Sequence, residues 1–171
     1  QDINQIADVM RDTTEMDEVR EHAGASLGRI GTDYIVDLLE HDLLHTNDYK
    51  SRLFCLLGLT VTEHEKANSI ILDRLIDENE DGRIRVAACY ALGDRKHTDV
   101  IPYAIQYINE QFMTEDSFLG SNRAVATLLK FQTPEAMDAI IDWSMMAVAD
   151  KGRPAIQRER AATYLKDHGD E

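Results

Sequence analysis

The sequence lacks the features of a membrane or secreted protein. Its 171 residues contain no apolar run long enough to cross a membrane. The N-terminus is acidic and polar, without the basic segment and apolar core of a signal peptide. There are only two cysteines, Cys55 and Cys89, and both fall on apolar faces of predicted helices. We interpret them as buried thiols rather than a disulfide, and we therefore expect a reducing compartment, the cytoplasm.

Positive charge is also scarce. The chain has 18 Lys and Arg residues against 32 Asp and Glu residues, which gives a formal net charge of −14 at pH 7. A chain this acidic is repelled by the nucleic-acid backbone and by anionic lipid. We therefore expect neither nucleic acid nor a membrane as a partner.

Signals of catalysis are few. The sequence has no glycine-rich loop of the kind that cradles phosphate, and neither cysteine has an evident activating neighbour. We therefore expect a protein that is not an enzyme and that holds no cofactor.

Period-two alternation is missing, whereas helical spacing recurs along the whole chain. In residues 18–32 the apolar side chains follow helical spacing, and Gly28 and Gly31 let the chain stop and turn back. The pattern returns in four further segments: 49–58, 84–93, 124–128 and 158–165. One leucine aligns in each copy: Leu27, Leu57, Leu92, Leu128 and Leu165. The steps of 30 to 37 residues between these leucines match a two-helix unit.

A second set of amphipathic helices is predicted between these copies, over residues 2–12, 33–45, 63–78, 98–113 and 134–149. Thr32 and Thr98 are predicted N-caps, and Pro134 can begin a helix after Thr133. The longest predicted loop is 114–120. We therefore predict an all-α fold: one domain, residues 1–171, forming an α-solenoid of about five two-helix repeats.

The segment 19–31 reads Val-Arg-x-x-Ala-x-x-x-Leu-Gly-x-Ile-Gly. It resembles a HEAT repeat of the phycobilisome-lyase type, and residues 84–93 followed by Asp99-Val100-Ile101-Pro102 are similar to the same pattern. The resemblance covers all five units and is sharpest in the first and third. It implies that the second set forms outer helices on a convex face, and that the repeated set forms inner helices lining a concave face. This repeat serves as a scaffold in proteins of many functions.

The alignment leaves one exposed row on each inner helix. It brings together a mildly basic set, here called the basic row: His22, Arg29, Arg52, Tyr90, Arg123, Lys130 and Arg160. Ala25 and Cys55 lie in the same column as Tyr90. We predict that the basic row binds a protein or peptide segment with acidic side chains. The alternative is that its arginines pair with carboxylates of adjacent repeats, as we expect for Arg20, Lys50, Arg85 and Arg158.

Two further clusters have alternative interpretations. Asp37, His41 and His45 are four residues apart on one helix face, a spacing that can hold zinc. Because no fourth ligand is visible, we interpret them as exposed polar residues and predict no metal. Trp143, Met145 and Met146 either pack in the core or form an exposed patch that docks a partner.

The preferred function is a non-enzymatic protein-interaction scaffold. One alternative, suggested by the repeat subtype, is a subunit of a bilin lyase or isomerase. Another is a structural spacer within a larger protein, since the chain begins at Gln1 without a methionine.

Overall fold

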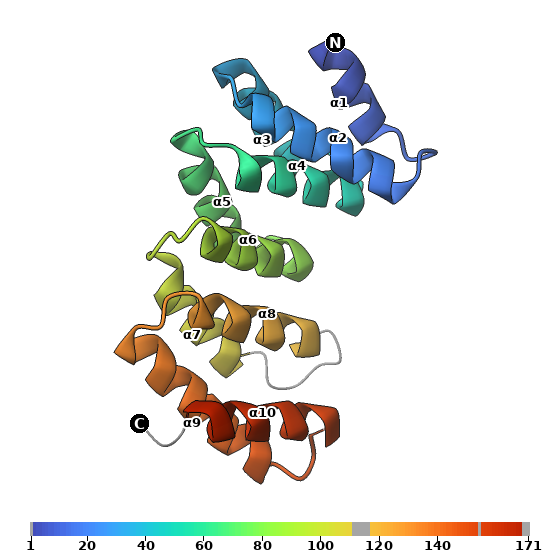
Figure 1. The fold of residues 1–171 in the computed structure, drawn as a ribbon. Coiled ribbons are helices and arrows are strands. Elements are labelled where there is room, and N and C mark those ends of the chain that lie inside the picture. The colour runs from blue at the N-terminus through green and yellow to red at the C-terminus, as the bar shows by residue number, and fades with distance from the viewer. Residues whose placement is uncertain (1, 111–116, 154, 169–171) are drawn as a thin grey trace. The chain divides into compact units, whose positions relative to one another are not determined.

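The computed structural model describes residues 2–110, 117–153 and 155–168. Within these ranges the chain forms ten α-helices and no strand, which confirms the predicted all-α class (Figure 1). The helices are α1 (Ile3–Arg11), α2 (Asp17–Ile30), α3 (Asp33–His45), α4 (Tyr49–Val61), α5 (Lys66–Ile76), α6 (Gly82–Asp94), α7 (Val100–Glu110), α8 (Ser117–Leu129), α9 (Pro134–Ala149) and α10 (Ala155–His168). No helix of the described part is long and apolar enough to cross a membrane.

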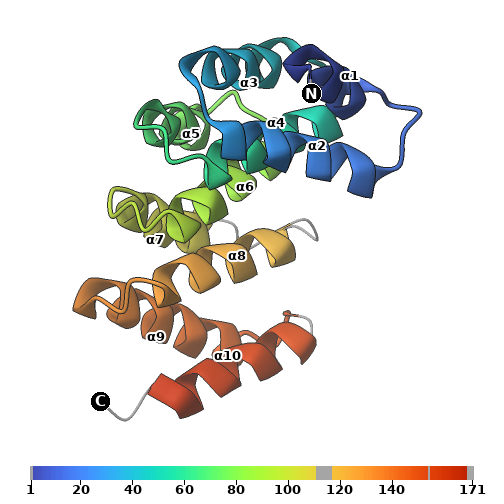
Figure 2. The same cartoon turned by 45° about the horizontal axis from the view of Figure 1, so that its top comes forward.

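The chain divides into two compact units, residues 1–97 and 98–171. In the first unit α1 packs on α2, α3 on α4 and α5 on α6, and α4 also packs against both α2 and α6 (Figure 2). The helices α2, α4 and α6 are the inner helices of the sequence analysis, and α1, α3 and α5 are the outer ones. In the second unit α9 packs against α7, α8 and α10, and α7 packs on α8.

Local signals in the sequence place several helix ends correctly, whereas α7 begins at Val100, two residues after the predicted N-cap Thr98. The Thr32 side chain accepts a hydrogen bond from the Ile35 N–H, and the Thr133 side chain accepts one from Ala136 at the start of α9. Gly31 closes α2 in the left-handed region, at φ 57°, where a Cβ is disfavoured. Part of the predicted loop 114–120 lies outside the described residues, and the rest belongs to α8, which begins at Ser117. Residues 111–113 of a predicted outer helix also lie outside them.

The buried leucines correct the predicted alignment of the second repeat. Leu27, Leu92 and Leu128 are fully buried, as predicted. In α4, however, the fully buried leucine is Leu59, whereas Leu57 is partly exposed. Leu165 is also only partly buried. The steps from Leu27 to Leu59 and from Leu59 to Leu92 are therefore 32 and 33 residues, more regular than the predicted steps.

Other buried residues agree with the sequence. Cys55 and Cys89 are both buried and are not joined in a disulfide, as predicted. Burial raises the pKa of the Cys55 thiol, and the nearby Asp42 carboxylate adds to the effect. Trp143 is 3% exposed and therefore belongs to the core, whereas its neighbours Met145 and Met146 are exposed.

Candidate functional site

Arginines on three successive inner helices make the same main-chain contact. The Nε atoms of Arg20, Arg52 and Arg85 each donate to a carbonyl in the last turn of the preceding outer helix. The acceptors are, in order, the carbonyls of Met10, Leu43 and Leu75, at 3.0, 2.7 and 3.0 Å. Carbonyls in the last turn of a helix have no partner within the helix, so the arginines satisfy them. The three arginines are structurally equivalent.

The prediction that Arg52 belongs to the basic row is therefore wrong. The predicted alignment matched Leu27 with Leu57 instead of Leu59 and was therefore displaced by two positions. It paired His22 with Arg52, whereas the residue equivalent to His22 is Phe54. The Arg52 side chain is only 18% exposed, and its Nη2 atom pairs with the Glu80 carboxylate at 2.6 Å. Arg52 therefore links α4 to the end of α3 and to Glu80, and most of its side chain is covered by these contacts.

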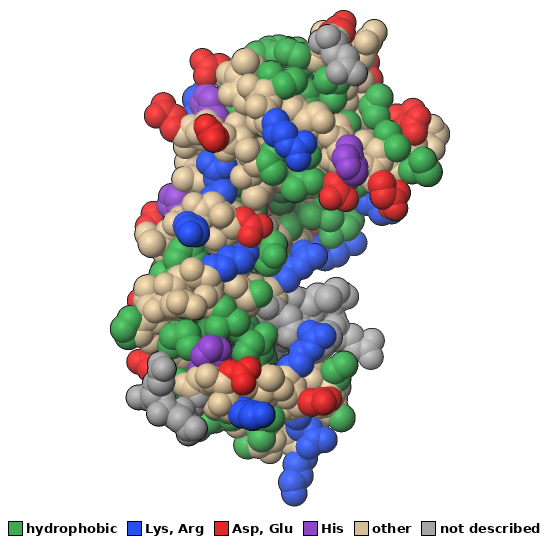
Figure 3. All heavy atoms as spheres, viewed as in Figure 1, with side chains coloured by type: hydrophobic (Ala, Val, Ile, Leu, Met, Phe, Trp, Pro, Cys, Tyr) green, Lys and Arg blue, Asp and Glu red, His purple; other side chains and the backbone are tan. Residues whose placement is uncertain are grey.

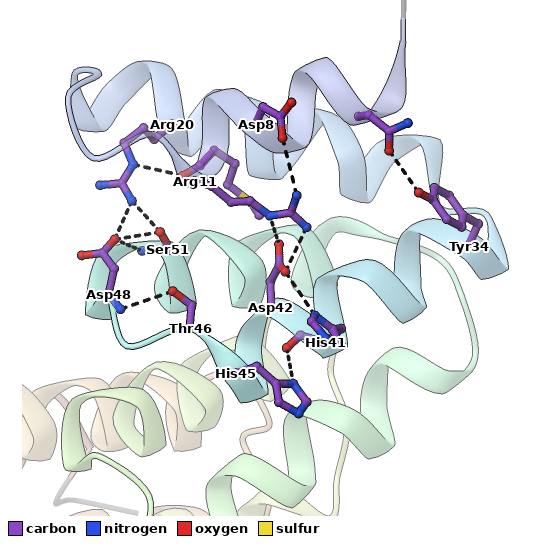
Figure 4. A network of polar contacts seen from close by, with 12 residues as sticks. Asp8, Arg11, Arg20, Tyr34, His41, Asp42, His45, Thr46, Asp48 and Ser51 are labelled. Atoms are coloured by element: carbon purple, nitrogen blue, oxygen red, sulfur yellow. Dashed lines mark hydrogen bonds and ion pairs between the residues drawn. The ribbon is translucent and has the colours of Figure 1, made fainter.

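Arg20 continues from its carbonyl contact into a polar network (Figure 4). Its Nη2 atom donates to Asp48 at 2.5 Å and to the Ser51 hydroxyl at 2.6 Å. Asp48 is also the N-cap of α4, accepting from the Ser51 N–H at 2.8 Å. Burial alone would raise the pKa of Asp48, but the hydrogen bonds from Arg20 and Ser51 outweigh burial and lower this pKa to about 2.

Further polar contacts link residues 29 to 33 positions apart in the first unit: the ion pairs Arg11–Asp42, Lys50–Asp17 and Lys66–Asp37, and the contact of His64 with Asp33. The predicted pairing of Arg20 and Lys50 with carboxylates is thus confirmed. Arg85 contacts a carbonyl instead. In the second unit, the Nε atom of Arg158 is buried and has no hydrogen-bond partner within the described residues.

Arg95, which the repeat pattern did not single out, covers the end of α4. Its Nη1 atom donates to the carbonyls of Leu59 and Thr60, at 3.1 and 3.0 Å, and to that of Thr62. Its Nε atom donates to the Asn68 side chain. Desolvation lowers the pKa of Arg95. The guanidinium completes the hydrogen bonding of the last turn of α4 and ties α6 to it.

The three residues of the possible zinc face do not converge. Asp37 pairs with Lys66 at 3.3 Å, and the Nδ1 atom of His45 lies 2.8 Å from the His41 carbonyl. The His41 and His45 rings stack, with centroids 4.4 Å apart, and His41 also contacts Asp42 (Figure 4). No group of three or more His, Cys, Asp or Glu residues within the described ranges could hold a metal ion.

The remaining residues of the basic row are divided between the two units. In the first unit His22 and Arg29 are exposed on α2, and Tyr90 is 39% exposed on α6. The Nδ1 atom of His22 lies 2.6 Å from the Glu18 carbonyl. In the second unit, Arg123 and Arg160 are exposed and Lys130 is partly exposed.

The corrected alignment changes the centre of the exposed row in the first unit. Leu57, rather than the buried Cys55, is the α4 residue equivalent to Tyr90 on α6. We call His22, Arg29, Leu57 and Tyr90 the inner face. In Figure 3, hydrophobic side chains occupy the area between α2 and α6, and charged and histidine side chains surround them. The inner face therefore combines the partly exposed Leu57 and the exposed Tyr90 with the exposed polar side chains of His22 and Arg29.

Sequence reasoning missed one motif on α2. Residues 24–28 read Gly-Ala-Ser-Leu-Gly, the spacing of a hydrolase nucleophile motif, in which the serine lies on a sharp turn between a strand and a helix. Here the segment lies inside α2. A Cβ on Gly24 would lie 2.5 Å from the Phe54 carbonyl oxygen, and one on Gly28 would lie 2.0 Å from that of Gly58. Both glycines allow α2 and α4 to approach closely, and the motif gives no reason to assign catalysis to Ser26.

The described residues form an all-helical protein that is built of packed helix pairs. Part of its exposed surface, on parallel helices, is apolar. Neither protein-family models nor curated proteins match the sequence. The assignment of function therefore depends on the geometry of the described residues.

Proposed function

We propose that the chain is a HEAT-like α-solenoid that acts as a non-enzymatic scaffold for a protein partner in the cytoplasm. The regular 32- and 33-residue spacing of Leu27, Leu59 and Leu92 supports the repeat assignment. So do the equivalent roles of Arg20, Arg52 and Arg85 in successive helix pairs. In a repeat array of this kind, equivalent exposed positions line up and form an extended binding surface.

The single observation that carries the binding proposal is the inner face of the first unit. Tyr90 is substantially exposed and Leu57 partly so, at equivalent positions of two helices that pack together. Tyrosine combines a large apolar ring with a hydroxyl and is enriched among residues that dominate interfaces. Arg29 and His22, exposed on α2 of the same unit, provide positive or hydrogen-bonding groups. The partner that fits is an extended or helical protein segment with an apolar anchor and a carboxylate.

Site-specific photo-cross-linking tests this proposal. A benzophenone amino acid replaces Tyr90, and the matched control carries it at Tyr34, an exposed tyrosine of the outer helix α3. We expect a discrete protein adduct from native lysate at position 90 and none at position 34. Equal labelling at both positions, or none at position 90, would contradict the inner face as the binding surface.

The partner's chemistry is tested on the captured protein. Arg29→Glu reverses a charge at the edge of the inner face without touching the core, because Arg29 is exposed. We expect it to weaken binding about tenfold, whereas Arg83→Glu, on an exposed arginine that pairs with Asp81 beside it, has a smaller effect. Equal losses in the two variants would argue for general electrostatic attraction.

A further inference from the structure

The second unit has an open apolar groove between its outer helices α7 and α9. The groove measures 540 Å³, and its lining residues are Ile105 of α7 and Glu135, Ala139, Asp142, Met145 and Met146 of α9. The α9 residues follow helical spacing and therefore share one side of the helix. Met145 and Met146 are 53% and 49% exposed, which is high for large apolar side chains.

The charged side chains that line this groove are both acidic. Neither α7 nor α9 contains a lysine or arginine. Glu135 and Asp142 line the groove, and Asp138, also exposed, lies between them along α9. The helix α9 therefore contributes these three carboxylates and neither helix contributes a Lys or Arg, which favours a cationic partner over an anionic one.

We propose that the α7–α9 groove binds an amphipathic helical segment of another protein, one with leucine-like anchors on one side and Lys or Arg beside them. Methionine side chains are flexible and polarizable, and surfaces rich in them adapt to the apolar face of a helix. The carboxylates of Glu135 and Asp142 select a basic segment. An acidic segment or an anionic lipid surface is disfavoured by the same charges.

This groove lies on residues other than the inner face, so the two proposals are tested separately. The probe is a fluorescein-labelled 18-residue Leu/Lys peptide with its leucines at helical spacing. Two control peptides replace every lysine by glutamate or scramble the leucines so that no apolar face forms. Fluorescence anisotropy with the full chain measures binding at low and high NaCl.

We expect saturable micromolar binding of the Leu/Lys peptide and none of either control peptide. Met145→Gln with Met146→Gln should weaken binding about tenfold, because the apolar anchors lose their contact. Glu135→Gln with Asp142→Asn should weaken it about fivefold and reduce its dependence on salt. The matched controls change the first unit: Met16→Gln for the exposed methionines, and Glu15→Gln with Glu63→Gln for an equal change of charge. Neither control should alter affinity.

Folding of each variant is checked by far-UV circular dichroism and by the emission of Trp143, the only tryptophan, which is buried on α9 itself. Absence of saturable binding would overturn the proposal, as would equal binding of the Leu/Glu peptide. Equal losses in groove and control variants would show general attraction to an acidic protein. If light scattering showed a dimer that the methionine variants abolish, the occupant would be a second copy and the proposal would be wrong.

Discussion

At the scale of single residues, Gly28 of α2 lies directly against the backbone of Gly58 in α4. A Cβ on Gly28 would lie 2.0 Å from the Gly58 carbonyl oxygen and 2.7 Å from its Cα atom. These are backbone atoms, so the clash is relieved only if α2 and α4 move apart. A side chain at position 28 would therefore reduce the packing between these two inner helices.

Gly28→Ala should therefore destabilise the protein. We expect its free energy of unfolding to fall by about 3 kcal/mol, the upper range for overpacking a tight contact. Urea unfolding followed by circular dichroism at 222 nm measures the change. Gly82→Ala is the matched control, because a Cβ there meets no atom within 4 Å. A loss of similar size at both positions would show that the helix contact is not the cause.

Asp48 gives a pH-dependent prediction. Its pKa is about 2 in the folded protein, below the ordinary 3.8, so its ionised form stabilises the fold above pH 4. This contribution is lost as the pH falls from about 5 towards 2. Asp48→Asn keeps an N-cap side chain for α4 but removes the charge that Arg20 contacts.

We expect Asp48→Asn to cost about 1 kcal/mol at pH 7, discounted from the pKa shift because Asp48 is partly exposed. The difference from wild type should shrink as the pH is lowered to about 2.5. Urea unfolding at several pH values measures it. A difference that stays constant with pH would mean that the lost charge is not what stabilises the fold.

At the scale of elements, Arg95 joins α6 to the end of α4. Three main-chain carbonyls at that end accept from one guanidinium group. Arg95→Gln leaves them with fewer donors and should lower stability by about 2 kcal/mol, as expected for hydrogen bonds to a charged group. Relative to wild type, amide hydrogen exchange should increase more at the C-terminal end of α4 than at its start. Arg29→Gln, on an exposed arginine of α2, is the control.

The elements also show what the sequence can predict. Helix positions followed from the spacing of apolar residues, and Thr32, Gly31 and Thr133 marked ends that the structure confirms. The alignment of α4 could not be read in this way, because residues 53–59 contain four leucines. Periodicity permits Leu57 or Leu59 as the core leucine, and only the packing of α4 on its neighbours decides between them.

The same limit applies to the functional surfaces. Gly28 and Gly58 are 30 residues apart, so the sequence suggests that they occupy equivalent positions on α2 and α4. In the structure they instead contact each other. A signal for the correct alignment was available, since Arg20, Arg52 and Arg85 follow the apolar residues Met10, Leu43 and Leu75 by nine or ten positions. Trp143 is buried, as the core interpretation predicts, whereas Met145 and Met146 are exposed.

At the scale of the whole molecule, the net charge of −14 sets two electrostatic effects against each other. Repulsion among many exposed carboxylates destabilises the folded chain and is screened by salt. Ion pairs such as Arg20–Asp48 and Arg52–Glu80 stabilise it, but they are partly buried and are therefore screened less. Repulsion should be the effect that salt changes more.

We therefore expect the melting temperature to rise by about 2–4 °C when NaCl is raised from 10 to 150 mM, equivalent to a stabilisation of roughly 1 kcal/mol. Glu15→Gln with Glu78→Gln removes two exposed carboxylates and brings the net charge from −14 to −12. This variant should melt higher than wild type at low salt and respond less to added salt. A melting temperature that falls with salt would mean that the ion pairs between repeats, rather than the excess of negative charge, dominate the electrostatics of the fold.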